Sequence, residues 1–179
     1  MKFLAIPGSI RTGSYNVALL QAMSTLSPDG TDITLFDGLK DIPIFDPEVN
    51  VTDLPEAVEA LQSNIRATDG IIISTPEYAH GITGVLKNLL DWFVSSDTLV
   101  LKPVVVTSVS TSGLGGVRAH SPLVMNLTAM NAYVVVEGSM NVPYARQKFD
   151  AELNLTDTLT RQAMAVSLAA LQQAVRRST

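Results

Sequence analysis

The chain has 179 residues, of which 46% are hydrophobic and 16% charged, so it is long enough for one domain of ordinary size and too apolar for intrinsic disorder. It has no cysteine, which excludes disulfide bonds, thiolate nucleophiles and cysteine-ligated metal centres, and its two histidines leave little scope for a histidine-rich metal site. The formal net charge of −5 opposes a broad nucleic-acid surface, because phosphate binding needs clustered Lys and Arg.

The first apolar stretch of the chain is broken by Pro7 and Gly8, which leaves it too short for the apolar region of a signal peptide. No window approaches the roughly 18 uninterrupted apolar residues of a membrane-spanning helix. We therefore expect a soluble, cytoplasmic protein that binds neither membrane nor nucleic acid.

Short, β-rich apolar runs alternate with helical patterns, which is typical of a parallel sheet covered on both faces. The predicted strands are Lys2–Pro7, Asp32–Phe36, Ile71–Ile73, Val104–Val109 and Tyr133–Val136. The predicted helices lie within Tyr15–Leu26, Leu54–Ala67, Ile82–Val94, Gly113–Met130 and a last segment ending near Arg176, which follows an irregular stretch over Asn141–Thr158. Successive β/α units imply a right-handed, doubly wound α/β sheet, and no linker divides them, so we expect residues 1–179 to form one domain.

The loop from Gly8 to Ser14 follows the first predicted strand and precedes a helix. Free backbone N–H groups and the helix dipole favour an anion at such a place, while serine hydroxyls and Arg11 supply donors and positive charge. The G-x-G-x-x-G spacing of a dinucleotide fingerprint and the lysine of a P-loop are both absent. The loop is therefore either a site for a single phosphate or an ordinary turn.

Two further loops end apolar strands, over Thr75–Gly81 and Ser108–Gly116. Pro76 stiffens the first loop and Tyr78 offers it an aromatic face, while the glycines of the second loop permit positive φ and a close approach to a ligand. Because the carboxyl ends of parallel strands meet at one edge of a sheet, the three loops together suit a mononucleotide with a large planar ring.

The segments GSIRTGSYN (8–16) and TPEYAHGITGVLKNLLDW (75–92) resemble the NADPH-dependent FMN reductase family, which includes quinone, azo-dye and chromate reductases. The resemblance implies a flavodoxin-like, doubly wound, five-stranded parallel sheet of order 2-1-3-4-5 with helices on both faces. It also implies FMN as cofactor and NADPH or NADH as electron donor. The residues implied in FMN binding are Ser9, Arg11, Ser14 and Asn16 at the phosphate, with Tyr15 beside it, and Pro76, Glu77, Tyr78 and Ala79 along the isoalloxazine, with Ser110 and Gly113 on its other side.

The implied activity is hydride transfer from NAD(P)H through FMN to a quinone-like, azo, flavin or metal-oxyanion acceptor. Such chemistry occurs on the flavin and needs no catalytic side chain. Two alternatives stay open at this point: an electron carrier of the flavodoxin type and a non-catalytic nucleotide-sensing module.

The family uses the helix within Ile82–Val94 to pair subunits, which implies a homodimer or tetramer with flavin sites at the subunit boundary. Trp92 falls outside the apolar stripe of that helix and therefore predicts a second apolar face.

Four other side chains have a functional and a structural interpretation. Glu77 could act as a general base but is expected to contribute its backbone. Arg118 could contact the 2′-phosphate of NADPH but is expected to face solvent, and His80 and His120 are expected in exposed loop positions. A serine hydrolase is disfavoured because the G-x-S-x-G motif is absent.

Overall fold

The computed structural model describes residues 1–50 and 52–178. Its centre is a parallel sheet of order β2-β1-β3-β4-β5, with a further strand, β6, paired to β4. The strands are β1 (Lys2–Pro7), β2 (Asp32–Leu35), β3 (Gly70–Ser74), β4 (Pro103–Val109), β5 (Tyr133–Val134) and β6 (Met140–Val142). This is the flavodoxin-like order, so the predicted fold class is confirmed.

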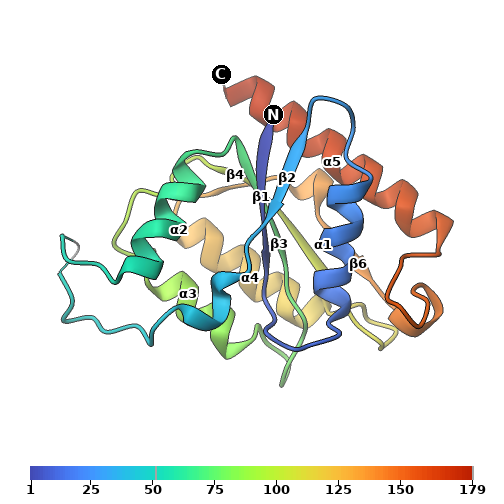
Figure 1. Ribbon diagram of the computed structural model, residues 1–179, viewed down its shortest axis with the longest axis horizontal. Coiled ribbons are helices and arrows are strands. Elements are labelled where there is room, and N and C mark those ends of the chain that lie inside the picture. Colours follow the sequence, from blue (N-terminus) through green and yellow to red (C-terminus); the bar gives the residue numbers. More distant parts are fainter. Residues whose placement is uncertain (51, 179) are drawn as a thin grey trace.

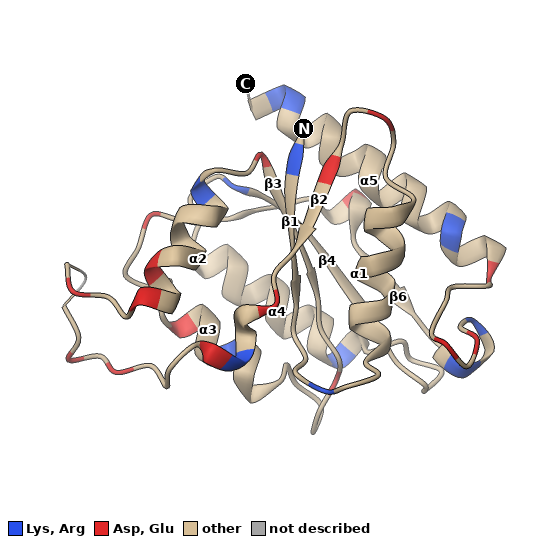
Figure 2. Ribbon diagram, viewed as in Figure 1, with Lys and Arg blue, Asp and Glu red and all other residues tan. Residues whose placement is uncertain are grey.

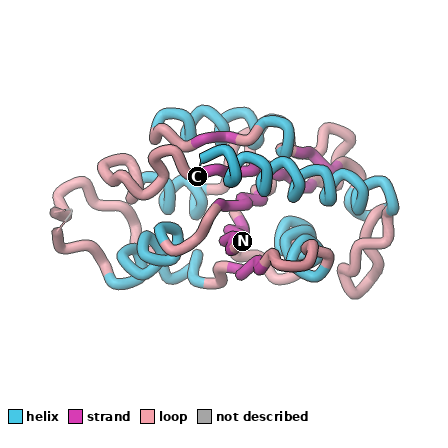
Figure 3. Tube along the Cα trace, turned by 90° about the horizontal axis from the view of Figure 1, so that it is seen from above, coloured by secondary structure: helices cyan, strands magenta, loops and turns pink. Residues whose placement is uncertain are grey.

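Helices cover both faces of this sheet (Figure 1). One face packs against α1 (Tyr15–Thr25) and α5 (Thr158–Ser178), and the other against α2 (Glu56–Arg66), α3 (Gly84–Asp91) and α4 (Val117–Ala129). The strands are seen between these two layers from above in Figure 3. Within β3, Ile72 belongs to the first core and its neighbours Ile71 and Ile73 to the second, which is why the strand is apolar at consecutive positions.

The fifth position of the sheet differs from the predicted strand Tyr133–Val136. β5 ends at Val134, a short 3-10 helix (Val136–Gly138) follows, and β6 then resumes the parallel pairing with β4, overlapping the start of the stretch predicted as irregular. A Cβ atom on Gly138 would lie 2.7 Å from Cγ2 of Val105, so the interruption brings the backbone so close to β4 that a larger residue would force its neighbours to shift. An apolar run alone does not reveal such a break.

The helices α3 and α4 begin later than predicted, because a capping residue or a turn residue fixes the start of each. The hydroxyl of Thr83 accepts the N–H of Leu86 at 3.3 Å and so caps α3, and α4 begins after Gly116, which has a φ of 82°. Residues 113–116 are therefore a turn at the edge of the sheet and not the first turn of a helix.

The prediction that Trp92 marks a second apolar face is wrong. Trp92 is buried, its indole N–H donates to the carbonyl oxygen of Pro43 at 2.9 Å, and its ring meets the edge of the Phe45 ring with centroids 5.2 Å apart. The loop after β2 folds back over the end of α3, so this indole is covered by its own chain.

No helix among the described residues is long and apolar enough to cross a membrane. The loops that follow β1, β3 and β4 meet at the lower edge of the sheet in the view of Figure 1. These are the three loops in which the sequence predicts the functional residues.

Candidate functional site

A hollow of about 110 Å³ lies where the carboxyl ends of β1, β3 and β4 meet. Nine of the eleven predicted site residues line it, the exceptions being Ala79 and Gly113. The residues that line the hollow are Ser9, Arg11, Gly13, Ser14, Tyr15, Asn16, Pro76, Glu77, Tyr78, Val109, Ser110 and Thr111.

The end of the hollow next to α1 has the properties of an anion site. Ser14 is the N-cap residue of α1, but its hydroxyl makes no capping hydrogen bond and faces the same hollow as the buried Ser9. The first N–H groups of a helix have no acceptor within the helix, and they carry the positive end of its dipole. Arg11 is exposed beside them, and its guanidinium has no partner in the described part of the chain.

The distribution of charge agrees with an anion at this place. Figure 2 shows acidic residues gathered over α2, α3 and the loop before α2, whereas α1 carries no charged residue. The net charge of −5 is therefore concentrated away from the anion site.

Asn16 lies in the hollow, but its side chain is held by the protein. Its amide nitrogen donates to the carbonyl oxygen of Val109 at 3.0 Å, and its amide oxygen accepts the N–H of Val109 at 2.9 Å and the hydroxyl of Ser74 at 2.9 Å. The side chain is buried, at 2% exposure. It therefore ties α1 to β3 and β4 and fixes where the N-terminus of α1 points.

The loop after β3 is a tight turn that presents Tyr78 to solvent. Tyr78 and Gly81 exchange backbone hydrogen bonds of 3.1 and 3.0 Å, and Ala79 and His80 between them have φ values of 48° and 63°. This turn keeps Ala79 out of the hollow, while Tyr78 lines it with 53% of its surface exposed. An exposed aromatic side chain at a hollow offers a surface on which a planar ring can stack.

The carboxylate of Glu77 is engaged with α4. Its Oε2 accepts the backbone N–H of Arg118, in the first turn of that helix, at 3.2 Å. A carboxylate is favoured at a helix N-terminus, so this contact supports the structural interpretation of Glu77 over the general base.

The two histidines differ in their surroundings. His80 is exposed, as predicted, and its Nε2 lies 2.7 Å from Nη1 of the exposed Arg118. The prediction for His120 is wrong, because His120 lies on α4 and is only partly exposed, and burial lowers the pKa of its imidazole. Neither histidine lines the hollow.

The loop after β4 closes the third side of the hollow. The hydroxyl of Ser110 accepts the N–H of Ser112 at 3.1 Å, and its carbonyl oxygen accepts the N–H of Ala145 at 3.0 Å. Gly113 does not line the hollow, but a Cβ atom there would lie 2.6 Å from the hydroxyl of Tyr144, which shows how closely the segment after β6 packs on this loop.

Three lining residues were not predicted: Gly13, Val109 and Thr111. Gly13 and Thr111 lie inside loops that the sequence had already singled out, so their position in those loops was the available signal. Val109 ends an apolar strand and is indistinguishable in sequence from a core residue.

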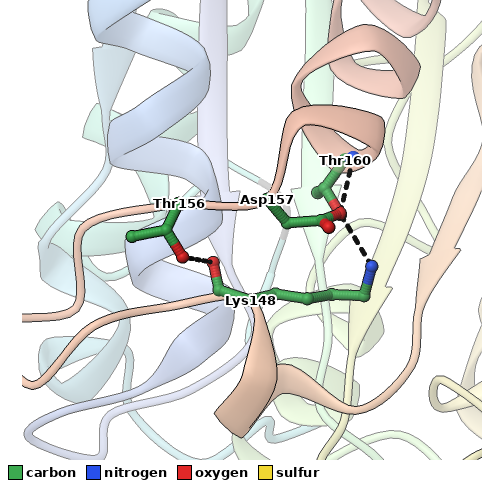
Figure 4. A network of polar contacts seen from close by, with 4 residues as sticks. All are labelled: Lys148, Thr156, Asp157 and Thr160. Carbon is green, nitrogen blue, oxygen red and sulfur yellow. Dashed lines mark hydrogen bonds and ion pairs between the residues drawn. The ribbon is translucent and has the colours of Figure 1, made fainter.

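The segment from Lys148 to Asp157 packs against Tyr15, one of the residues that line the hollow. Phe149 packs against Tyr15 with ring centroids 5.4 Å apart. Figure 4 shows the polar contacts that join the two ends of the segment. There the ammonium group of Lys148 lies 2.8 Å from Oδ2 of Asp157, which also accepts the N–H of Thr160 at 2.8 Å. The hydrogen bonds from Lys148 and then Thr160 lower the pKa of Asp157 to about 2.

Comparison with known proteins identifies the family of the chain. Residues 1–147 match the model of the family described as NADPH-dependent FMN reductase. The chain belongs to this family. It is 35% identical to an NAD(P)H-dependent FMN reductase of Pseudomonas aeruginosa, over 99% of this chain and 96% of that protein. It is 32% identical to the quinone reductase of Escherichia coli K12, over 75% of this chain and 73% of that protein.

A solved structure shares the fold over nearly the whole length. FerB, a flavoenzyme NAD(P)H:(acceptor) oxidoreductase from Paracoccus denitrificans, superposes with a TM-score of 0.87 at 22% identity, covering 98% of this chain and 97% of that one. As a member of the NADPH-dependent FMN reductase family, the chain is an oxidoreductase with FMN and NAD(P)H as its cofactors.

The residues of the hollow fit FMN. A phosphomonoester requires hydrogen-bond donors and positive charge, which the α1 N-terminus, two serine hydroxyls and Arg11 provide at one end. A flat ring system requires an aromatic or backbone wall, which Pro76, Tyr78 and Ser110 provide at the other.

Proposed function

We propose that the chain transfers reducing equivalents from NAD(P)H through FMN to a quinone, and that azo compounds, free flavin and metal oxyanions are further acceptors. The observation that carries the proposal is the anion site of α1 in the same hollow as the half-exposed Tyr78. The quinone reductase of E. coli, 32% identical, supports quinones as the first choice of acceptor.

The chain's own residues would bind and orient the cofactor. Ser9, Ser14 and Arg11 would hold the phosphate through hydroxyl and guanidinium groups, with Tyr15 beside it. Asn16 would contribute by holding α1 in place, since its amide is already engaged with Val109. Pro76, Glu77 and Tyr78 would line one side of the ring and Ser110 another, while Ala79 would act through the turn that it forms with His80.

When bound, FMN would supply the hydride-accepting and electron-donating group, so no side chain has to supply a base or a nucleophile. The exposed side of Tyr78 leaves room for a planar substrate at the mouth of the hollow. NAD(P)H would bind there first and leave before the acceptor binds in the same place. Shared use of one face predicts ping-pong kinetics and a broad range of planar acceptors.

Residues 1–179 would act as one domain. Met164, Leu168 and Leu171 of α5 belong to the same core as Phe3 of β1 and Ile72 of β3, so the part of the chain beyond residue 147 is packed into the sheet that holds the site. A cytoplasmic location fits the need for reduced nicotinamide nucleotides.

We further propose a homodimer or tetramer with FMN sites at the subunit boundary. Trp92 no longer supports an apolar face, but α4 offers a different one: Val117 and Met125 on its outer side are 38% and 73% exposed, and Leu114 just before it is 53% exposed. α4 begins at the loop that closes the hollow, so a partner on this face would lie beside the site. Analytical ultracentrifugation at micromolar concentration tests this, and a mass of about 19.1 kDa would contradict it.

The decisive experiment on the function is an absorbance spectrum of the purified protein, reconstituted with FMN, before and after anaerobic addition of NADPH or NADH. A flavin band that is bleached by the nucleotide and restored by a quinone supports the proposal. A flavin band that neither nucleotide bleaches would indicate an electron carrier of the flavodoxin type, and protein that does not bind FMN would indicate a nucleotide-sensing module.

A further inference from the structure

A second hollow, of about 250 Å³, adjoins the FMN site on the other side of the loop after β1. It lies between this loop and the carboxyl end of β2, and it shares Ser9 and Arg11 with the first hollow. A ligand bound in one hollow would therefore be separated from a ligand in the other only by residues of the same loop.

The walls of this second hollow are apolar in spite of their exposure. Ile10 is 57% exposed at its mouth, and the side chains of Val17, Leu35 and Phe36 are partly exposed within it. The Phe36 ring lies directly against Gly38, where a Cβ atom would be 3.0 Å from two of its ring carbons. A hollow lined by an aromatic ring and aliphatic side chains suits a flat heterocycle.

The rim of this hollow carries charges that the fold does not use. Lys40, on a short 3-10 helix (Gly38–Asp41), lines it with an exposed side chain that has no partner within residues 1–50 and 52–178. Arg11 lines the same hollow, and Asp37, two residues after the end of β2, is exposed there. Two cations and one carboxylate thus line an apolar hollow.

The position of the hollow in the sheet suggests its ligand. The register pairs Ala5 of β1 with Leu35 of β2, and Phe36 donates its N–H to the carbonyl oxygen of Ala5 at 2.8 Å, so the residues after β2 lie beside the loop of α1. In doubly wound folds that bind dinucleotides, the adenosine half lies beyond the first βα turn, and an acidic residue on the second strand binds the ribose. Asp37 is in the corresponding place, although the glycine fingerprint of those folds is absent.

We propose that this second hollow binds the adenosine diphosphate half of the reduced nicotinamide dinucleotide. The inference rests on the proposed function and names the place where the electron donor is recognised. The adenine would lie between Phe36 and Ile10, the ribose hydroxyls would donate to the carboxylate of Asp37, and Lys40 would meet the diphosphate. The nicotinamide end would then reach across the loop after β1 toward the FMN site.

Reduced nicotinamide mononucleotide provides the sharpest test, because it carries the same hydride but lacks the adenosine half. Lys40→Ala should raise the KM for NADH and NADPH about fivefold, as for one exposed charged contact, and leave the KM for the mononucleotide and the Kd for FMN within about twofold. Lys87→Ala is the matched control, since Lys87 is an exposed lysine on α3 that pairs with Asp91 and lines neither hollow.

ADP tests the hollow without any turnover. Calorimetric titration of oxidised, FMN-loaded protein should show that ADP binds, and that Lys40→Ala weakens this binding to the same extent as it raises the KM for NADH. In separate steady-state assays, ADP should inhibit competitively with respect to NADH. Asp37→Asn should shift donor use toward NADPH relative to NADH, because it removes a carboxylate that repels a 2′-phosphate.

Three outcomes would overturn the proposal: no competition between ADP and NADH, an equal effect of Lys40→Ala on the dinucleotide and the mononucleotide, or a loss of dinucleotide affinity in Arg118→Ala and not in Lys40→Ala. The last result would move the donor site to the rim formed by Arg118 and His80. If no nicotinamide nucleotide bleaches the flavin, the proposed function fails, whereas ADP binding that depends on Lys40 would still support the hollow.

Discussion

Asn16 and Val109, which lie 93 positions apart in the chain, exchange two hydrogen bonds of 3.0 and 2.9 Å that join the first turn of α1 to the end of β4. The phosphate end of the site, at α1, and its ring end, at β4, are therefore held together by the side chain of Asn16. The hydroxyl of Ser74 adds a third hydrogen bond, from β3 to the amide oxygen of Asn16. Asn16 therefore joins α1, which follows β1, to both β3 and β4.

Replacing Asn16 by Leu should lower the free energy of unfolding by about 2–4 kcal/mol, because the N–H and carbonyl oxygen of Val109 would both be left buried without partners. FMN affinity should fall as well, since the N-terminus of α1 would lose its fixed direction. Urea unfolding followed by circular dichroism measures the first effect and flavin fluorescence titration the second. Asn154→Leu serves as the control for the unfolding measurement, because Asn154 bonds only to exposed groups of Asp150 and its own loop. A stable Asn16→Leu protein would show that the connection is dispensable.

Arg11→Ala should weaken FMN binding by about 1.5–3 kcal/mol, the range for hydrogen bonds to a charged group. The fold should be unaffected, because the guanidinium has no partner among the residues that the structure describes. Riboflavin, which has the same ring and no phosphate, should bind the variant and the wild type equally. The prediction fails if FMN affinity is unchanged, or if riboflavin affinity falls in parallel with it. Arg66→Ala, which removes an exposed ion pair with Asp97, is the matched arginine control.

Gly116→Ala should destabilise the protein by about 3 kcal/mol or more, because two costs combine. The new Cβ would lie 1.9 Å from the hydroxyl oxygen of Ser108, and a φ of 82° is unfavourable for alanine. In the double variant with Ser108→Ala the steric part should be relieved, so that the two changes together cost about 1 kcal/mol less than their sum. Thermal unfolding of the four proteins measures this coupling, and strict additivity would argue that the backbone conformation alone determines the cost.

The parts of the fold that could be predicted from the sequence are those fixed by local pattern. The consecutive isoleucines Ile71–Ile73 predict a strand that is buried on both faces. The serine- and glycine-containing loop after β1 predicts either an anion site or a turn, at the same edge of the sheet. The parts that could not be predicted depend on partners far along the chain. Trp92 is covered by Pro43, 49 positions earlier, and the periodicity of a helix does not show which segment will cover it.

The same distinction holds within the site. Ser9, Ser14 and Tyr78 could be predicted because their own loops explain their positions. The amide of Asn16 was predicted at the phosphate, and only the three-dimensional structure shows that Val109 and Ser74 already engage it. Likewise, a carboxylate beside an apolar strand does not reveal that Glu77 accepts the N–H of Arg118.

Asp157 should make the stability of the protein depend on acid pH. Hydrogen bonds from Lys148 and Thr160 lower the pKa of its carboxyl from the ordinary value of 3.8 to about 2. A group whose pKa is lower in the folded state binds protons more readily when unfolded, so its contribution is complete above about pH 4 and is lost as the pH falls from there toward 2.

At neutral pH, Asp157→Ala should cost about 1–2 kcal/mol, because it removes the hydrogen bond to the N–H of Thr160 at the start of α5 together with a partly exposed ion pair to Lys148. The difference in the free energy of unfolding between wild type and variant should shrink as the pH falls below about 4, which urea unfolding at several pH values can measure. Asp97→Ala provides a control, because Asp97 pairs with Arg66 at the surface and caps no such segment. Since the segment from Lys148 to Asp157 places Phe149 against Tyr15, FMN affinity should decline with the same pH dependence in the wild type. A stability difference that stays constant down to pH 2 would show that the carboxylate of Asp157 contributes nothing through its charge.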